Sequence, residues 1–150
     1  MRQGLLLEIL ARRGGPVDHE RGRLRHELGA APTLAGLVRC LVVPYAALVH
    51  QQGGRSYLRI VAQLRGQFAA WRIESDATTT KHLAAILDEL EIAADHPPAI
   101  AAERIVALIM LLTGTVAERA RRIDDGSANE LDHEAFVANL IAMCAAMISA

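Results

Sequence analysis

The sequence predicts an all-α fold of about seven helices in a single domain of 150 residues. Apolar residues recur at intervals of three and four along most of the chain, which is the period of an amphipathic helix. Nowhere do β-branched residues alternate with polar ones over more than a few positions, so no strand is expected. Glycine and proline lie mainly between the periodic segments, where they end helices.

The first two helices are expected to be short and separate. Apolar spacing predicts a helix over Gly4 to Arg13, and Gly14-Gly15-Pro16 should end it. An arginine-rich helix then follows from Asp18 to Leu28, with Gly29 placed as its C-cap.

The third helix is expected to begin at Thr33, a good N-cap residue, and to reach about Gln51. Pro44 interrupts this helix and should kink it, because proline removes one backbone hydrogen bond. Two interpretations of the kink remain open. It either bends the helix around the core, or it lines a cavity in which the freed carbonyl meets a ligand or water.

The remaining helices are bounded by turns, capping residues or prolines, with the Gly53-Gly54 turn before the first of them. They are expected over Arg55 to about Ile73, Asp76 or Thr78 to about Asp95, Ala99 to about Asp124, and Glu130 or Asp132 to the end of the chain.

Charge and motifs exclude several classes of function. The net charge is −1, with arginines concentrated in the first half and acids in the second, which fits either an acidic partner or ordinary solvated surfaces. No nucleophile elbow, phosphate-binding loop or zinc-protease motif is present. A di-iron bundle needs two E-x-x-H motifs and two further glutamates, and only one such spacing, Glu130 to His133, is present. His19 and His26 lack a third ligand. We therefore expect no enzyme activity, no metal and no cofactor.

Localisation and redox state also follow from composition. There is no signal peptide, and the uncharged runs at 105–117 and 135–150 are shorter than the roughly 20 residues that span a bilayer. A tail anchor is a minor alternative. Cys40 and Cys144 lie on separate predicted helices and are expected to be buried, reduced thiols of a cytoplasmic protein.

Each of the last two helices carries two apolar stripes, which is more apolar surface than packing against one core requires. One stripe can serve the core of the chain, and the other is expected to face a second copy, forming a four-helix bundle across a two-fold axis. Four aliphatic residues per chain, counted on both chains of the symmetric pair, supply on the order of 10–20 kcal/mol, against an association cost of about 4–15 kcal/mol. The alternative is an internal helical hairpin in a monomer. The expected interface residues are Ile105, Ile109, Leu112, Val116, Val137, Ile141, Cys144 and Ile148.

Five segments resemble regulators of the tetracycline-repressor type, the TetR family. Residues 117–126 and 134–141 are similar to the closing helices of that family, and residues 37–44 are similar to its kinked sensor helix. Residues 5–13 with 18–21 resemble the join between its DNA-binding head and its sensor body. The resemblance implies an all-α body that dimerises through its last two helices and holds an effector pocket among its middle helices.

The sequence departs from that family at its start. The helix-turn-helix head that normally precedes residue 5 is absent, so residues 1–13 are expected to be a remnant of the join. DNA would then be bound only through a head that this chain lacks.

The expected effector pocket combines the kink at Pro44 with four of the five aromatic residues of the chain. Such a lining favours a small, largely apolar effector, with tyrosine hydroxyls or Arg65 as polar contacts. Each residue could equally fill the core. A dimerisation module without a ligand and a small helical enzyme are the rival functions. The expected pocket residues are Leu41, Tyr45, Tyr57, Leu64, Arg65, Phe68, Trp71, Leu87, Met110 and Thr113.

Overall fold

The computed structural model describes residues 2–64 and 77–150, and it describes side chains for residues 12–64 and 80–150. Within these ranges every regular element is helical, so the all-α prediction is confirmed. The elements are α1 (Arg2–Glu27), α2 (Leu34–Ala46), the short 3₁₀-helix η1 (Ala47–His50), α3 (Gly54–Leu64), α5 (Ala77–Ala93), α6 (Pro98–Asp124) and α7 (His133–Ser149).

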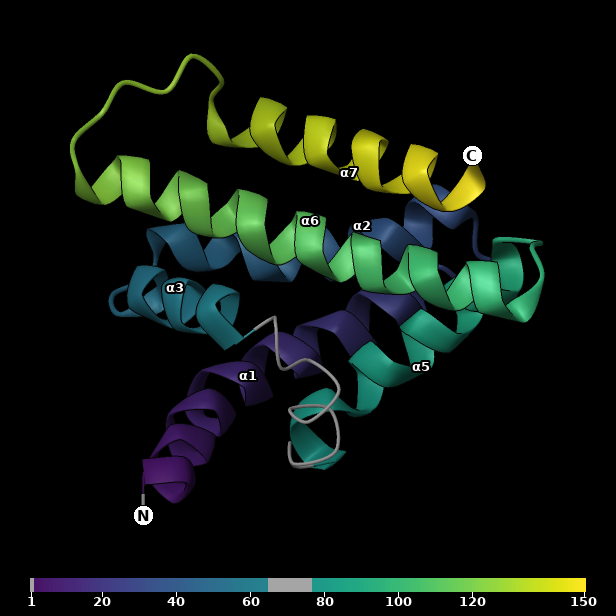
Figure 1. Cartoon of the computed structure of the whole chain (residues 1–150), viewed down its shortest axis with the longest axis horizontal. Coiled ribbons are helices and arrows are strands. Elements are labelled where there is room, and N and C mark those ends of the chain that lie inside the picture. The colour runs from purple at the N-terminus through teal and green to yellow at the C-terminus, as the bar shows by residue number, and fades with distance from the viewer. Residues whose placement is uncertain (1, 65–76) are drawn as a thin grey trace.

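The helix α2 lies at the centre of the fold, where it contacts α1, α5, α6 and α7. The two last helices, α6 and α7, run antiparallel along one side of the molecule, and α1 crosses α5 on the other (Figure 1). The antiparallel pairing is fixed at one end by Arg104, which donates from Nη1 to the backbone oxygen of Met147 at 3.0 Å. At the other end Arg119 donates to the backbone oxygen of Leu131 at 2.9 Å.

The start of the chain differs from the expectation of two short helices. The helix α1 continues through Gly14, Gly15 and Pro16 to Glu27. Proline inside a helix costs a hydrogen bond and crowds the preceding turn. The turn that follows is anchored by tertiary packing, because Val17 and Asp18 are almost fully buried where α1 meets α2 and α5. Burial across two neighbouring helices therefore outweighs the local helix-breaking signal.

The third predicted helix is also modified by its proline. Thr33 is confirmed as the N-cap of α2, since its side chain accepts a hydrogen bond from the Gly36 amide at 3.0 Å. The α-helical geometry ends at Ala46, two residues after Pro44, and the chain tightens into η1 up to His50. The predicted continuous helix to Gln51 is thus a shorter α-helix followed by a 3₁₀ turn, the form that helix ends commonly take.

Most of the remaining helix boundaries agree with the sequence. Asp132 caps α7 by accepting from the Ala135 amide at 2.8 Å, Pro98 is the first residue of α6, and Gly29 has the positive φ of 75° of a C-cap. The predicted helix from Arg55 is α3 as far as Leu64, and its expected continuation to Ile73 lies outside the described residues, as does Asp76.

The helix α6 is long and apolar enough to cross a membrane by length and composition alone, which the count of uncharged residues did not indicate. It has 27 residues and a mean hydropathy of 1.8 over its most apolar window, and 39% of that window is buried inside the fold. A core helix of a folded domain passes the same test, and α6 packs against α3, α5 and α7.

Candidate functional site

The structure brings several of the predicted pocket residues together in the interior. Leu41, Tyr45, Tyr57 and Leu87 are all at most 6% exposed. Thr113 is also buried, and its hydroxyl donates to the backbone oxygen of Ile109 at 2.7 Å, so it is already satisfied. Leu64 is partly buried against the same core. Arg65, Phe68 and Trp71 lie outside the described residues.

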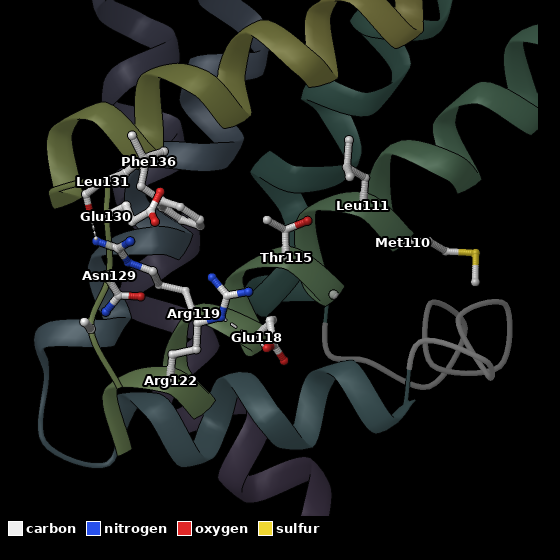
Figure 2. Close-up of a pocket in the computed structure, with 12 residues that line it drawn as sticks. Met110, Leu111, Thr115, Glu118, Arg119, Arg122, Asn129, Glu130, Leu131 and Phe136 are labelled. Atoms are coloured by element: carbon white, nitrogen blue, oxygen red, sulfur yellow. Dashed lines mark hydrogen bonds and ion pairs between the residues drawn. The ribbon is translucent and has the colours of Figure 1, made fainter. Parts of the chain in front are cut away.

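Met110 is a correction to the predicted pocket. Its side chain is 47% exposed, and Figure 2 shows it on the outer side of α6, away from the interior. Successive helical residues are about 100° apart around the axis, so a helix that turns Ile109 and Thr113 inward turns Met110 outward. Sequence periodicity alone did not settle which side of this apolar helix faces the core.

Two buried tyrosines and an arginine form a polar group inside the apolar core, drawn from three helices. Tyr45 is on α2, Tyr57 on α3, and Arg21, which is 7% exposed, on α1. Burial raises the pKa of Tyr45 well above its usual range, with Tyr57 adding to the rise and Arg21 opposing it. Burial likewise raises the pKa of Tyr57, again opposed by Arg21. The two phenols therefore stay protonated and act as neutral hydrogen-bonding groups.

Asp18 balances the charge of Arg21 and joins α1 to α5. Its carboxylate accepts from Nη1 of Arg21 at 3.2 Å, and from the backbone amides of His82 and Leu83 at 2.9 Å each. Among the described residues, Nε of Arg21 and the hydroxyl of Tyr45 have no hydrogen-bond partner although both atoms are buried. Buried polar atoms are normally paired, so this group has spare hydrogen-bonding capacity.

Sequence reasoning missed Arg21 and Asp18, although a signal was present. Arg21 occupies a position in the apolar stripe formed by Val17, Leu24 and Leu28, at helical spacing of three and four. A lone arginine in such a stripe is placed on the buried side of its helix. The stripe was not apparent while the helix was expected to begin at Asp18.

An open pocket of about 510 Å³ lies between α1 and the junction of α2 with η1. Pro44 is part of its wall, so the proline does border a cavity, as one of the two interpretations of the kink required. The other lining residues are Arg12, Arg13, Pro16, Val17, Glu20, Ala47, Leu48 and Gln51.

A second hollow, of about 680 Å³, opens on the outer side of the α6–α7 pair (Figure 2). The guanidinium of Arg119 lies over the ring of Phe136, 4.7 Å from its centroid, and closes the inner end. Met110, Leu111 and Gly114 of α6 contribute an apolar wall. The groove therefore belongs to the outward surface of the terminal helices and not to the interior pocket.

The predicted interface residues lie in or against the core of the single chain. Ile105, Ile109, Leu112, Val116, Cys144 and Ile148 are at most 6% exposed, and Val137 and Ile141 are partly buried against the same core. These stripes are covered within one chain because α6 packs against both α3 and α7, while α7 also packs on α2. The burial of Cys40 and Cys144 as free thiols was predicted correctly.

The outward surface of α7 is made of small, uncharged residues. Ala138, Asn139, Ala142 and Ala146 are exposed, and Met143 beside them is 41% exposed. On α6, Met110 and Ala107 are exposed on the side of the groove. This face, from here on the α6–α7 outer face, comprises these residues and carries none of the charges that usually cover the solvent side of a helix, whereas the adjoining groove is lined by charged residues as well.

No metal centre is formed within the part of the chain that the structure describes, where no group of three or more His, Cys, Asp or Glu side chains is suitably placed. His50 and His133 do meet, with ring centroids 4.4 Å apart in an edge-to-face arrangement, and they bring η1 to the start of α7.

Comparison with known proteins gives one match. The family model described as the tetracyclin repressor-like C-terminal domain matches residues 39–147, which is most of the chain. No curated protein and no solved structure is similar enough to match.

Proposed function

Because the chain belongs to the tetracycline repressor-like C-terminal domains, which are parts of transcriptional regulators, we propose that it senses a small ligand and joins two copies of such a regulator. Regulators of this family are soluble, and the packing of α6 fits that class. The proposal places the chain in the cytoplasm as one sensing and dimerisation domain, with residues 1–13 leading toward a DNA-binding head. It assigns no catalytic role to the chain.

The uncharged α6–α7 outer face is the observation that carries the dimerisation proposal. Small residues such as Ala138, Ala142 and Ala146 allow the axes of two helices to approach closely, since interaxial distance depends on the side chains at the contact. Pairing two such faces about a two-fold axis gives a four-helix bundle built from α6 and α7 of each copy. Met110 and Met143 would then pass from solvent into the interface.

Sensing is supported by two features of the other half of the fold. The pocket beside Pro44 opens between α1 and α2, and the buried group of Arg21, Tyr45 and Tyr57 lies between the same helices and α3. Ligand sites are typically apolar with a few polar groups that fix orientation. A ligand that binds one arrangement of these helices better than another shifts the population toward it, and α1 would carry the shift toward a head.

The rival is a dimerisation module that senses nothing. It is favoured by the tight burial of Leu41, Tyr45 and Leu87, which fill the core in the manner of ordinary structural residues. A thermal-shift screen against apolar compounds separates the two functions, because a ligand that binds the folded state raises the melting temperature.

Mass measurement by light scattering tests the dimer directly. The wild-type chain is expected at about twice 16.2 kDa at micromolar concentration. Ala142→Arg places a charge on the outer face without touching the core and is expected to return the monomer mass with unchanged helix content. Ala93→Arg, at the exposed end of α5, is the matched control and should remain dimeric. Aspartate at Ile148 is unsuitable, because that side chain is fully buried within one chain and its loss would unfold the monomer.

A wild-type mass of 16.2 kDa at micromolar concentration would rule out the dimer. Dimers that persist in Ala142→Arg would show that the two copies meet through another surface.

A further inference from the structure

The buried group around Arg21 has hydrogen-bond donors left over. A guanidinium carries five N–H donors, and among the described residues Arg21 uses one of them, toward Asp18. Its Nε is buried without a partner there, and so is the hydroxyl of Tyr45. Both side chains are more than nine-tenths buried, at 7% and 3% exposure. Two unpaired polar groups in one apolar interior are costly to the fold unless something else satisfies them.

The local charge determines whether an anion, a cation or a neutral molecule can form hydrogen bonds with the unpaired groups of Arg21 and Tyr45. Asp18 already neutralises Arg21, and its carboxylate is held by two backbone amides besides the guanidinium. An anion brought into this interior would leave an uncompensated negative charge in an apolar setting, and a cation would leave an uncompensated positive one. A neutral acceptor oxygen adds hydrogen bonds and no net charge.

The apolar side chains around Arg21 and Tyr45 determine the chemistry of the rest of the ligand. Leu41 and Leu87, together with the ring of Tyr57, are buried in the same core, so a ligand that enters must be largely apolar. The pocket beside Pro44 borders the two helices, α1 and α2, that carry Arg21 and Tyr45. Its walls include Val17, one turn before Arg21 on α1, and Pro44 itself, next to Tyr45 on α2.

We propose that the effector of this domain is a neutral, largely apolar molecule with a carbonyl-type oxygen that accepts hydrogen bonds from Arg21 and Tyr45. The assignment rests on the proposed sensing function and sharpens it. It adds Arg21 to the tyrosine hydroxyls and Arg65 that the sequence offered as polar contacts, and it excludes carboxylic acids as the preferred class.

Three planar probes of nearly the same shape test the proposal: acetophenone, benzoate and α-methylstyrene. They differ in presenting a neutral carbonyl, a carboxylate or a hydrocarbon at the same position. Titration of the ¹⁵N-labelled full chain, followed by NMR, gives a Kd for each. Acetophenone is expected to bind about two- to tenfold more tightly than α-methylstyrene, the range of one net hydrogen bond, and more tightly than benzoate. The Nε–H resonance of Arg21 should move with acetophenone and stay in place with α-methylstyrene.

Tyr45→Phe supplies the matched variant, because it removes the unpartnered hydroxyl and keeps the ring. It is expected to reduce the preference for acetophenone over α-methylstyrene and to leave the affinity for α-methylstyrene unchanged. Arg21→Gln should do the same if it folds, and the Arg21 resonance in the wild-type chain gives the answer if it does not.

The outcomes separate this proposal from the sensing function. Equal binding of acetophenone and α-methylstyrene, or tighter binding of benzoate, overturns the neutral-carbonyl assignment while sensing of an apolar ligand stands. Failure of all three probes to shift any core resonance up to their solubility limits overturns both. A preference for acetophenone that Tyr45→Phe leaves intact also overturns the assignment.

Discussion

Replacing Asp18 by alanine is expected to destabilise the fold strongly, for a reason visible in its contacts. The carboxylate is 1% exposed and accepts three hydrogen bonds, from Arg21 and from the amides of His82 and Leu83. Its removal leaves the buried guanidinium of Arg21 without a counter-charge. Breaking a buried ion pair from one side costs about 3–5 kcal/mol, a large share of the roughly 5–15 kcal/mol that holds a typical domain together.

Thermal unfolding followed by circular dichroism measures this cost. At this chain length each kcal/mol lowers the melting temperature by about 2–4 °C, so Asp18→Ala should lower it by roughly 6–20 °C. All variants must be compared at one protein concentration, because the stability of a dimer depends on it. Glu20→Ala is the control on the same helix. Glu20 pairs with Arg23 at the surface, and its loss should cost less than about 1 kcal/mol.

A double variant isolates the charge. Adding Arg21→Met to Asp18→Ala removes the unpaired guanidinium, so the double variant is expected to be more stable than Asp18→Ala alone. Two results would refute the reasoning. One is a melting temperature for Asp18→Ala within the range of Glu20→Ala, and the other is a double variant less stable than Asp18→Ala. Either would mean that the Arg21 charge is not confined to the interior.

Two further predictions address the helix crossing and the response to acid. Gly22 lets α1 approach α5, since a Cβ there would lie 2.6 Å from the ring of His82. Gly22→Ala should therefore lower the melting temperature of the wild-type chain. In a His82→Ala background the same change should raise the melting temperature, because the higher helix propensity of alanine adds up to about 1 kcal/mol to the free energy of unfolding. Burial lowers the pKa of His133, and the nearby His50 and Arg119 lower it further, against Asp132. The unfolded chain therefore takes up a proton at higher pH than the folded one, so stability should fall as the pH drops below about 6.5 toward the folded pKa. His133→Gln should reduce this loss in melting curves recorded at several pH values, whereas His26→Gln, at an exposed site, should retain it.

Each of these two predictions, on Gly22 and on His133, has a result that would contradict it. A Gly22→Ala effect that is the same with and without His82 would show that the two residues do not meet. An acid response of His133→Gln identical to that of the wild-type chain would assign the response to other groups.

Local chemistry made much of the fold predictable. Thr33 and Asp132 cap their helices with their own side chains, and Gly29 takes the backbone angle that glycine tolerates best. Pro98 begins α6 because backbone N–H groups in the first turn of a helix have no partner within the helix, so the N–H that proline lacks is not missed there. These signals act within one turn of the chain, so they need no knowledge of what the helix packs against.

Local signals failed where packing overruled them. Pro16 stands inside α1 because the turn after it is buried between two other helices. Arg21 was not among the predicted site residues for the same reason. Its position in the apolar stripe that includes Val17 indicates burial only if α1 is continuous through Pro16. The tyrosines at 45 and 57 fall on neighbouring helices, and both are buried in the core.

The sequence by itself determined that this chain is helical, where most of its helices start and stop, and that its last two helices contain the uncharged runs 105–117 and 135–150. Which sides of α6 and α7 remain outside was decided only by the tertiary structure. Helical periodicity gives the angle between side chains and leaves open which neighbours cover them. Along the uncharged runs of these two helices, α2, α3 and α5 cover the larger aliphatic stripes, and mainly alanines are left on the outward side of α7.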